Sequence, residues 1–254
     1  MTAGRDNGRV TPAALLAREL RRDGARPFLT WYDDATGERV ELSVATTANW
    51  VAKIANLLVD EFEVEPGATV RVLLPTHWET AMVLLATWSA GGAVTFDPDR
   101  TRATAVTVHA RPERALLVQL SSADVLVLDL EPMGAGLSRL VGAQPDDFVP
   151  PVPVDAAAAA LTGDGRSWSH AELAAAAGHA AAHHHLDASC RVLSTLPYDT
   201  VDGLDAGLLV PLAAGGSVVL VGNADPARLA ERCAAERVTH TAGVDVAGLP
   251  RLDG

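Results

Sequence analysis

The sequence predicts an α/β protein with two lobes, each a mostly parallel sheet flanked by helices. Short apolar runs that are typical of buried strands alternate along the chain with longer segments of helical periodicity. Parallel strands need a crossover of a dozen or more residues, and the helical segments supply it. Residues 144–155 hold four prolines and interrupt this alternation. We therefore expect a first lobe over residues 1–143, a stiff connector over 144–155 and a second lobe over 156–254.

Local signals support each element of the first lobe. Thr11 followed by Pro12 is typical of a helix start. The glycine-containing loop between residues 28–32 and 39–42 predicts a β-hairpin, and the apolar run 69–74 predicts a strand buried on both faces. The predicted strands are residues 28–32, 39–42, 69–74, 93–96, 114–118 and 125–128, and the predicted helices begin at Thr11, Ser43 and His77.

The second lobe repeats the alternation. Ser169 and Glu172 have the spacing of a capping box, which predicts a helix from there to about His185. Asp225 before Pro226 predicts another helix start. Residues 162–168 (TGDGRSW) are expected to form a loop. The predicted strands are residues 156–161, 191–196, 217–221 and 238–242, and a further helix is predicted over 204–214.

The composition excludes several classes of function. The 254 residues include 20 Lys and Arg against 32 Asp and Glu, a net charge of −12, so we expect no nucleic-acid partner and no anionic membrane surface. No apolar run reaches the ~20 residues of a membrane span, and the first residues lack a signal-peptide core. The 2 cysteines have no metal-finger or disulfide-framework spacing. These features favour a cytoplasmic protein.

Two stretches resemble a known family. Residues 49–97 contain a helix, a Pro-Gly turn, the strand TVRVLL and a helix that ends at Gly91-Gly92. Residues 195–243 contain LLVPLAAGGSVVLV and DPARLAERCAAERVTHTAGV. In this order they resemble the N-terminal domain of the adenylate-forming superfamily, which includes acyl-CoA synthetases, luciferases and peptide-synthetase adenylation domains. Both stretches are scaffold, so the resemblance implies the fold more strongly than the activity.

The resemblance implies a phosphate-binding loop, and the sequence departs from it there. The family reads roughly TSGTTGxPKG before SHxxL. The counterpart in this chain is Thr162, Gly163, Asp164, Gly165 and Arg166. It is shorter and lacks the lysine, and Asp164 would repel a phosphate by about 4 kcal/mol at ~4 Å before screening and before any compensation by Arg166. A plain glycine turn explains the same residues without a ligand.

The family's motif LPxxHxxG, which lies against the acyl pocket, has its counterpart at residues 196–203 (LPYDTVDG). Thr200 stands at the His position, preceded by Tyr198 and Asp199. The family's YGxTE stretch, ribose aspartate, hinge and C-terminal domain have no counterpart in the sequence. The resemblance therefore implies possible ligand-binding positions in these two motifs and no catalytic residue.

Two further clusters contain side chains of the kinds that bind metals. His179 and His183 share a helix face, but a third ligand is not apparent. Asp199, Asp202 and Asp205 lack the glycine and the final glutamate of a calcium loop. A polar helix end and a solvated junction explain these residues, so no metal site is predicted.

These observations predict a degenerate, non-catalytic relative of the adenylate-forming enzymes with a role in binding or assembly. ATP and magnesium are not expected as cofactors, because the lysines and the magnesium glutamate that neutralise phosphates are missing. Two alternatives stay open: a module that binds a nucleotide or acyl group, and half of a ligase completed by a separate chain. Residues 238–242 and the apolar tail 244–252 are expected to leave an uncovered edge, which predicts a homodimer.

Overall fold

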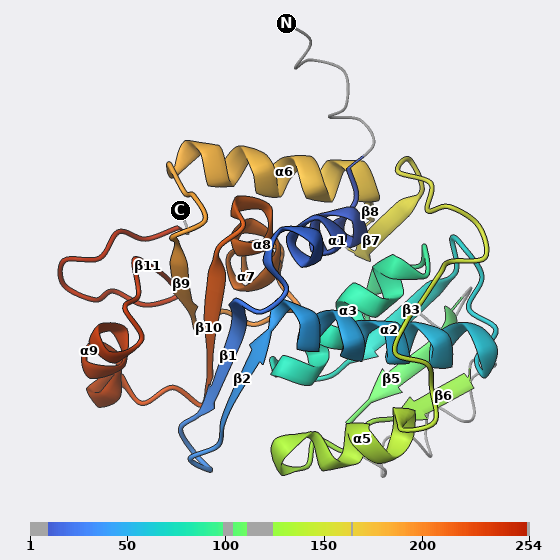
Figure 1. The fold of residues 1–254 in the computed structure, drawn as a ribbon, viewed down its shortest axis with the longest axis horizontal. Coiled ribbons are helices and arrows are strands. Elements are labelled where there is room, and N and C mark those ends of the chain that lie inside the picture. The colour runs from blue at the N-terminus through green and yellow to red at the C-terminus, as the bar shows by residue number, and fades with distance from the viewer. Residues whose placement is uncertain (1–9, 99–103, 111–123, 164, 253–254) are drawn as a thin grey trace, which may run out of the picture. The chain divides into compact units, whose positions relative to one another are not determined.

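The computed structural model describes residues 10–98, 104–110, 124–163 and 165–252. Within these ranges it contains two mostly parallel β-sheets with helices (Figure 1), which confirms the predicted α/β class. The contacts divide the chain into two compact units that interleave along the sequence. Unit 1 comprises residues 1–14, 48–75 and 79–173, and unit 2 comprises residues 15–47, 76–78 and 174–254.

Unit 1 contains a six-stranded sheet in the order β6-β5-β3-β4-β7-β8. Neighbouring strands are parallel except for the hairpin β7–β8. Val70 and Val72 of β3 are at most 1% exposed, as expected for a strand covered on both faces. The strands are β3 (Thr69–Leu73), β4 (Ala93–Thr95), β5 (Thr104–His109), β6 (Asp124–Val127), β7 (Ala159–Gly163) and β8 (Arg166–Ser169).

The helices around this sheet confirm several local predictions. They are α2 (Val44–Asp60), α3 (Trp78–Ser89), the 3-10 turn η1 (Pro132–Gly134), α5 (Ala135–Val141) and α6 (His170–His183); α2 and α3 begin in unit 2, and α6 continues into it. The capping box at the start of α6 is confirmed. The Ser169 hydroxyl accepts from the Glu172 amide at 3.2 Å, and the Glu172 carboxylate accepts from the Ser169 amide at 2.7 Å.

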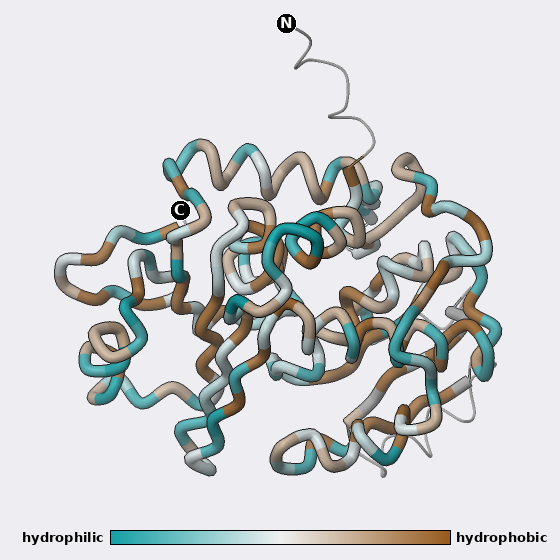
Figure 2. Tube along the Cα trace, viewed as in Figure 1, coloured by the Kyte–Doolittle hydropathy of each residue, from teal (hydrophilic) through white to brown (hydrophobic). Residues whose placement is uncertain are grey.

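Unit 2 contains a five-stranded sheet in the order β11-β9-β10-β1-β2 (Figure 1). All neighbours are parallel except β1 and β2, the predicted hairpin. The central strands are largely hydrophobic (Figure 2), and Val218, Val219 and Leu220 of β10 are fully buried. The strands are β1 (Pro27–Asp33), β2 (Arg39–Ser43), β9 (Arg191–Ser194), β10 (Ser217–Gly222) and β11 (His240–Ala242).

Short helical segments complete unit 2. They are α1 (Pro12–Asp23), which begins in unit 1, α7 (Val201–Leu204), the π-helix η2 (Asp205–Leu209), α8 (Val210–Ala214) and α9 (Pro226–Ala235). The predicted helix over 204–214 is thus a continuous helical stretch that starts three residues earlier and changes its winding in the middle. The Asp225 carboxylate caps α9 by accepting from the Ala227 amide at 3.0 Å.

A buried carboxylate holds α1 in unit 2. The Glu19 side chain is 1% exposed and lies 2.8 Å from Arg18, 3.0 Å from Arg26 and 3.6 Å from Arg22. Arg18 also donates to two carbonyl oxygens at the end of α8, at 3.2 and 2.7 Å. A cation at this position is favourable because the C-terminal end of a helix carries partial negative charge.

A second ionic network holds α9 against the sheet of unit 2. Arg232 on α9 donates to Asp34 at 2.5 Å, and its guanidinium lies 4.2 Å from the centre of the Tyr32 ring. Glu236, just after α9, pairs with Arg191 of β9. Burial alone would raise the pKa of Glu236, but hydrogen bonds from Tyr32 and Arg191 hold it below its usual value.

The C-terminal tail covers the edge strand of unit 2. The Thr241 amide of β11 donates to the Pro250 carbonyl at 2.9 Å, and the Leu252 amide donates to the Thr241 carbonyl at 2.9 Å. Val244 and Val246 pack on a core that includes Leu229 and Cys233. The expectation of an uncovered apolar edge is therefore wrong: the chain covers the edge itself, and this argument for a homodimer no longer holds.

The predicted division in sequence differs from the division in space. Residues 27–43 pair with strands that follow residue 190, whereas residues 159–169 join the sheet of residues 69–127. The segment 144–155 consequently links α5 to β7 inside unit 1 and is not a connector between lobes. Strand β5 was not predicted, and the strand predicted at 114–118 lies outside the described residues. No helix in the described ranges is long and apolar enough to span a membrane.

Candidate functional site

The counterpart of the phosphate loop, in unit 1, is part of the hairpin β7–β8. Thr162 pairs with Ser167, and Gly163 pairs with Arg166. The predicted loop over 162–168 is therefore mostly paired strand. Gly165 has a φ of +72°, the left-handed conformation that favours glycine in a tight turn. Backbone groups that pair across a hairpin are not available to a phosphate, in contrast to the free amides of a glycine-rich phosphate loop.

Two side chains of this hairpin make contacts within unit 1. Thr162 is 9% exposed, and its hydroxyl lies 3.5 Å from the Val94 carbonyl oxygen. Arg166 is exposed, and its guanidinium lies 5.1 Å from the centre of the Trp168 ring, a cation–π contact. Asp164 lies outside the described residues. The hairpin therefore presents one cation, Arg166, which already contacts an aromatic ring.

Tyr198 of the second motif is a core residue of unit 2. Its side chain is 1% exposed, and its hydroxyl donates to the Gly207 carbonyl oxygen of η2 at 3.1 Å. A Cβ at Gly207 would lie 3.1 Å from the Tyr198 ring, so the ring packs directly on the helix backbone. Burial raises the pKa of Tyr198 well above its usual value. Tyr198 thus fills space beneath η2.

Thr200, at the family's His position, is the N-cap of α7. Its hydroxyl accepts from the Gly203 amide at 3.1 Å and donates to the Pro197 carbonyl at 2.9 Å. A Cβ at Gly203 would lie 1.8 Å from that same carbonyl oxygen, so the turn requires glycine there. Asp199 is exposed. The motif residues Pro197, Thr200 and Gly203 therefore have a structural explanation that needs no ligand.

Sequence analysis did not single out Asp205 as an acid that titrates near neutrality. It begins the π-helix η2 and is partly buried. Burial, with a smaller contribution from Asp202, raises the pKa of Asp205 to about 6. Single π-turns inside helical stretches are frequent at functional sites. The two aspartates were considered only as metal ligands, and the raised pKa follows from burial that the sequence does not reveal.

A buried histidine in unit 2 was also missed. His77 is 7% exposed, and its ring centre lies 4.8 Å from that of Trp31. Its Nε2 lies 3.8 Å from Glu38 Oε2, which also accepts from Trp31 Nε1 at 3.3 Å. Burial lowers the pKa of His77 to about 4, although the charge of Glu38 acts in the opposite direction. His77 is therefore neutral at physiological pH.

Unit 1 buries a cation that the sequence placed in an apolar strand. Arg71 of β3 is 2% exposed and donates to the Thr107 hydroxyl and the Pro98 carbonyl, both at 3.0 Å. Thr95 on β4 and Thr107 on β5 pair with Arg71 and are fully buried. Arg71 is thus held in the interior of the sheet by a neighbouring strand and by the segment that follows β4.

The histidines of α6 and the aspartates around α7 do not form a metal site in the described residues. In the described part of the chain, no group of three or more His, Cys, Asp or Glu side chains could hold a metal ion. His183 contacts His184, with ring centres 5.0 Å apart.

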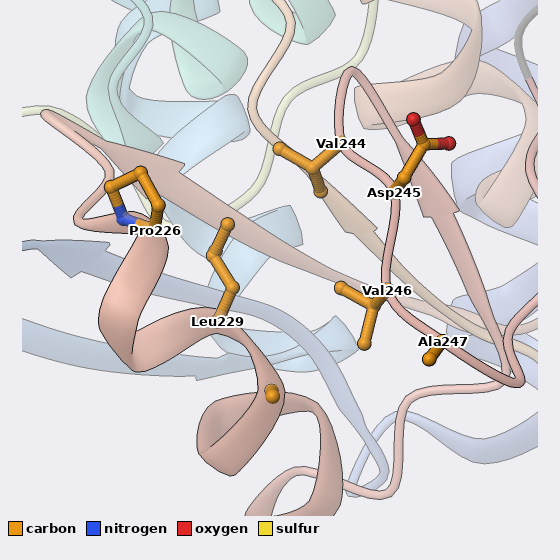
Figure 3. A pocket seen from close by; sticks show the side chains of 7 residues that line it. Pro226, Leu229, Val244, Asp245, Val246 and Ala247 are labelled. Carbon is orange, nitrogen blue, oxygen red and sulfur yellow. The ribbon is translucent and has the colours of Figure 1, made fainter.

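An apolar groove of about 360 Å³ lies between α9 and the segment after β11 (Figure 3). Leu229 of α9 faces Val244 and Val246 across it (Figure 3). Asp245 points away from the valines and pairs with Arg251 at 3.0 Å. The lining is mostly aliphatic, so the groove suits apolar groups better than the phosphates of a nucleotide.

The fold is that of the N-terminal domain of adenylate-forming acyl-CoA ligases. Apo MatB from Rhodopseudomonas palustris superposes with a TM-score of 0.74 at 21% identity, over 91% of this chain and 49% of MatB. The N-terminal domain of FACL13 from Mycobacterium tuberculosis superposes with a TM-score of 0.75 at 14% identity, over 92% of this chain and 62% of that one. This chain thus spans about half the length of MatB. At these identities the likeness concerns the fold alone.

The sequence matches no family model. It is 40% identical over 241 residues to a TIGR03089 family protein of Mycobacterium tuberculosis, a match that covers 89% of this chain and 95% of that protein. This identity over nearly the whole of both chains shows that the protein belongs to the TIGR03089 family.

Proposed function

We propose that the protein is a non-catalytic member of the adenylate-forming fold with a role in binding or assembly. The observation that carries this proposal is the hairpin β7–β8. An adenylating enzyme needs free amides and cations around the phosphates of ATP. Here Gly163 pairs with Arg166, and the Arg166 guanidinium contacts Trp168.

The distribution of charge supports the same proposal. Lys53, the only lysine of the sequence, donates to the Gln144 carbonyl at 2.7 Å and pairs with Asp146 at 2.7 Å, so it serves as an anchor inside unit 1. Thr200 supplies a helix cap where the family has a histidine. We therefore do not expect ATP and magnesium to act as cofactors.

The direct test is carboxylate-dependent exchange of pyrophosphate into ATP with a panel of fatty, aromatic and amino acids. We expect exchange at background for the wild type. Exchange above background that is lost in Arg166→Ala but kept in Arg21→Ala would overturn the proposal. Arg21 is an exposed arginine on α1 and serves as the matched control.

Binding without turnover is tested separately, because a nucleotide or acyl module is the main alternative. A ligand at 100 times its Kd stabilises a fold by about 2.7 kcal/mol, or roughly 5–10 °C for a chain of this size. We expect millimolar ATP with magnesium to shift the melting temperature by less than about 2 °C. A larger shift that increases further in Asp164→Ala would favour the binding module.

The remaining alternative is that this chain is half of a ligase, and the comparison with MatB is compatible with it. This chain spans 49% of MatB, and in this alternative a separate chain supplies a domain like the remainder of MatB. Exchange activity that appears only when a purified adenylating C-terminal domain is added would support it. A homodimer is no longer part of the proposal, since the tail 244–252 covers the edge that motivated it.

A further inference from the structure

Unit 1 carries an exposed apolar segment, residues 148–154 (FVPPVPV), which we call the proline strap. Val149 is 83% exposed and Val152 is 55% exposed. Val149 is more exposed than any other large hydrophobic side chain among the described residues. Isolated exposed valines are ordinary, but here two of them lie on one short proline-rich segment.

The backbone of the proline strap is open to a partner. Within the described ranges, none of its amides or carbonyls takes part in a hydrogen bond. Three of its seven residues are prolines, which carry no amide donor. The backbone carbonyls of the strap can therefore accept hydrogen bonds from a binding partner.

Both ends of the strap are fixed to unit 1. Before it, Lys53 donates to the Gln144 carbonyl at 2.7 Å, and Asn56 donates to the Asp147 carbonyl at 3.0 Å. After it, the Ala171 amide of α6 donates to the Ala156 carbonyl at 2.8 Å. A segment held at both ends loses less conformational entropy on binding than a free peptide would.

The sequence of the strap has the spacing recognised by grooves that bind polyproline II segments. Val149-Pro150 and Val152-Pro153 are two Val-Pro pairs three residues apart. A polyproline II helix has three residues per turn, so in that conformation the two pairs lie on one edge. The chain bends at Pro151 and Val152, and this bend has to open on binding. The prolines lower the free-energy cost of straightening this bend, because they fix their own φ and keep the preceding residues extended.

We propose that the proline strap is a docking segment for a protein partner whose groove is lined by aromatic side chains and takes the two Val-Pro pairs. Such grooves read PxxP segments in SH3, WW and EVH1 modules. The inference names a kind of partner for the assembly role proposed above. It stands on the strap alone, and its test does not involve nucleotide chemistry.

The test is a titration of the full chain with purified SH3, WW and EVH1 modules, followed by the fluorescence of the tryptophan or tyrosine residues in their grooves. It is run at about 0.15 M and about 0.5 M salt. The acidic residues that flank the strap would repel a groove with acidic residues at its rim, and the higher salt concentration screens this repulsion. Val149→Asp/Val152→Asp is the test variant. Val201→Asp, the same change at a 41% exposed valine outside the strap, is the matched control.

We expect at least one module to bind with a Kd below roughly 1 mM. The double variant should weaken that binding at least about tenfold with an unchanged melting temperature, and the control should bind like the wild type. The inference is overturned if no module binds at either salt concentration, or if the double variant binds as tightly as the wild type. Neither result bears on pyrophosphate exchange, so a failure here is distinguishable from a failure of the proposed function.

Discussion

Replacing Glu19 by glutamine tests whether the buried carboxylate holds α1 in unit 2. The substitution keeps the size of the side chain and removes its charge, which leaves Arg26 without its ionic partner at 3.0 Å. Arg26 is only 17% exposed, whereas Arg18 and Arg22 are 46% and 54% exposed and can turn to solvent. Breaking a buried ion pair costs about 3–5 kcal/mol, and exposed pairs contribute about 1 kcal/mol or less. Since Arg26 is partly accessible, we expect a loss of about 2–4 kcal/mol.

The measurement is urea unfolding followed by circular dichroism, with Glu231→Gln on the exposed face of α9 as the control. The loss corresponds to a fall of roughly 4–16 °C in melting temperature. The double variant Glu19→Gln/Arg26→Met should recover part of the loss, because it removes the stranded cation. If Glu19→Gln unfolds within about 0.5 kcal/mol of the wild type, the ionic cluster does not hold the helix and the reasoning is refuted.

Three further predictions concern unit 2, each measured by urea unfolding. Gly203→Ala should lower the free energy of unfolding by more than about 3 kcal/mol, because its Cβ would lie 1.8 Å from the Pro197 carbonyl oxygen. Gly178→Ala, where a Cβ meets open space, should change it by less than about 1 kcal/mol, and equal effects of the two substitutions would contradict the packing at Gly203. Tyr198→Phe should cost about 1 kcal/mol through the lost 3.1 Å hydrogen bond, and no change would show that the hydroxyl is not needed. His77 has a folded pKa of about 4 against an ordinary 6.5, so the unfolded chain binds the proton more readily. The free energy of unfolding should therefore fall between about pH 6.5 and 4 by up to roughly 3 kcal/mol, and His77→Gln should flatten this fall. A fall of the same size in the variant would show that His77 does not cause it.

Elements with local signals were predictable. The hairpin β1–β2, the capping box at Ser169 and the cap at Asp225 each depend on residues within a few positions of one another. The two scaffold stretches likewise identified the family fold, since they contain consecutive strands and helices in a specific order.

The shape of the candidate site was less predictable, although a signal was present. Asp164-Gly165 is a common two-residue hairpin sequence, and this local signal predicts a hairpin where the family resemblance implies a phosphate loop. The pKa of Asp205 and the contact of His77 with Trp31 depend on packing between segments distant in sequence. Which strands share a sheet could not be predicted for the same reason, because pairing between strands far apart in sequence leaves no local pattern.

The pairing of β1 with β10 has a consequence for synthesis on the ribosome. Asp33 accepts a hydrogen bond from Asn223, 190 residues later, and every residue of β1 from Leu29 to Asp33 waits for a partner in β10. At about 5–20 residues per second, the ribosome needs roughly 10–40 s to make that partner. During this interval the hairpin β1–β2 lacks the neighbouring strand β10, and long-range parallel pairing is slow to form. The protein is thus expected to complete unit 2 only near the end of translation, and a holdase that binds the emerging hairpin would raise its folding yield.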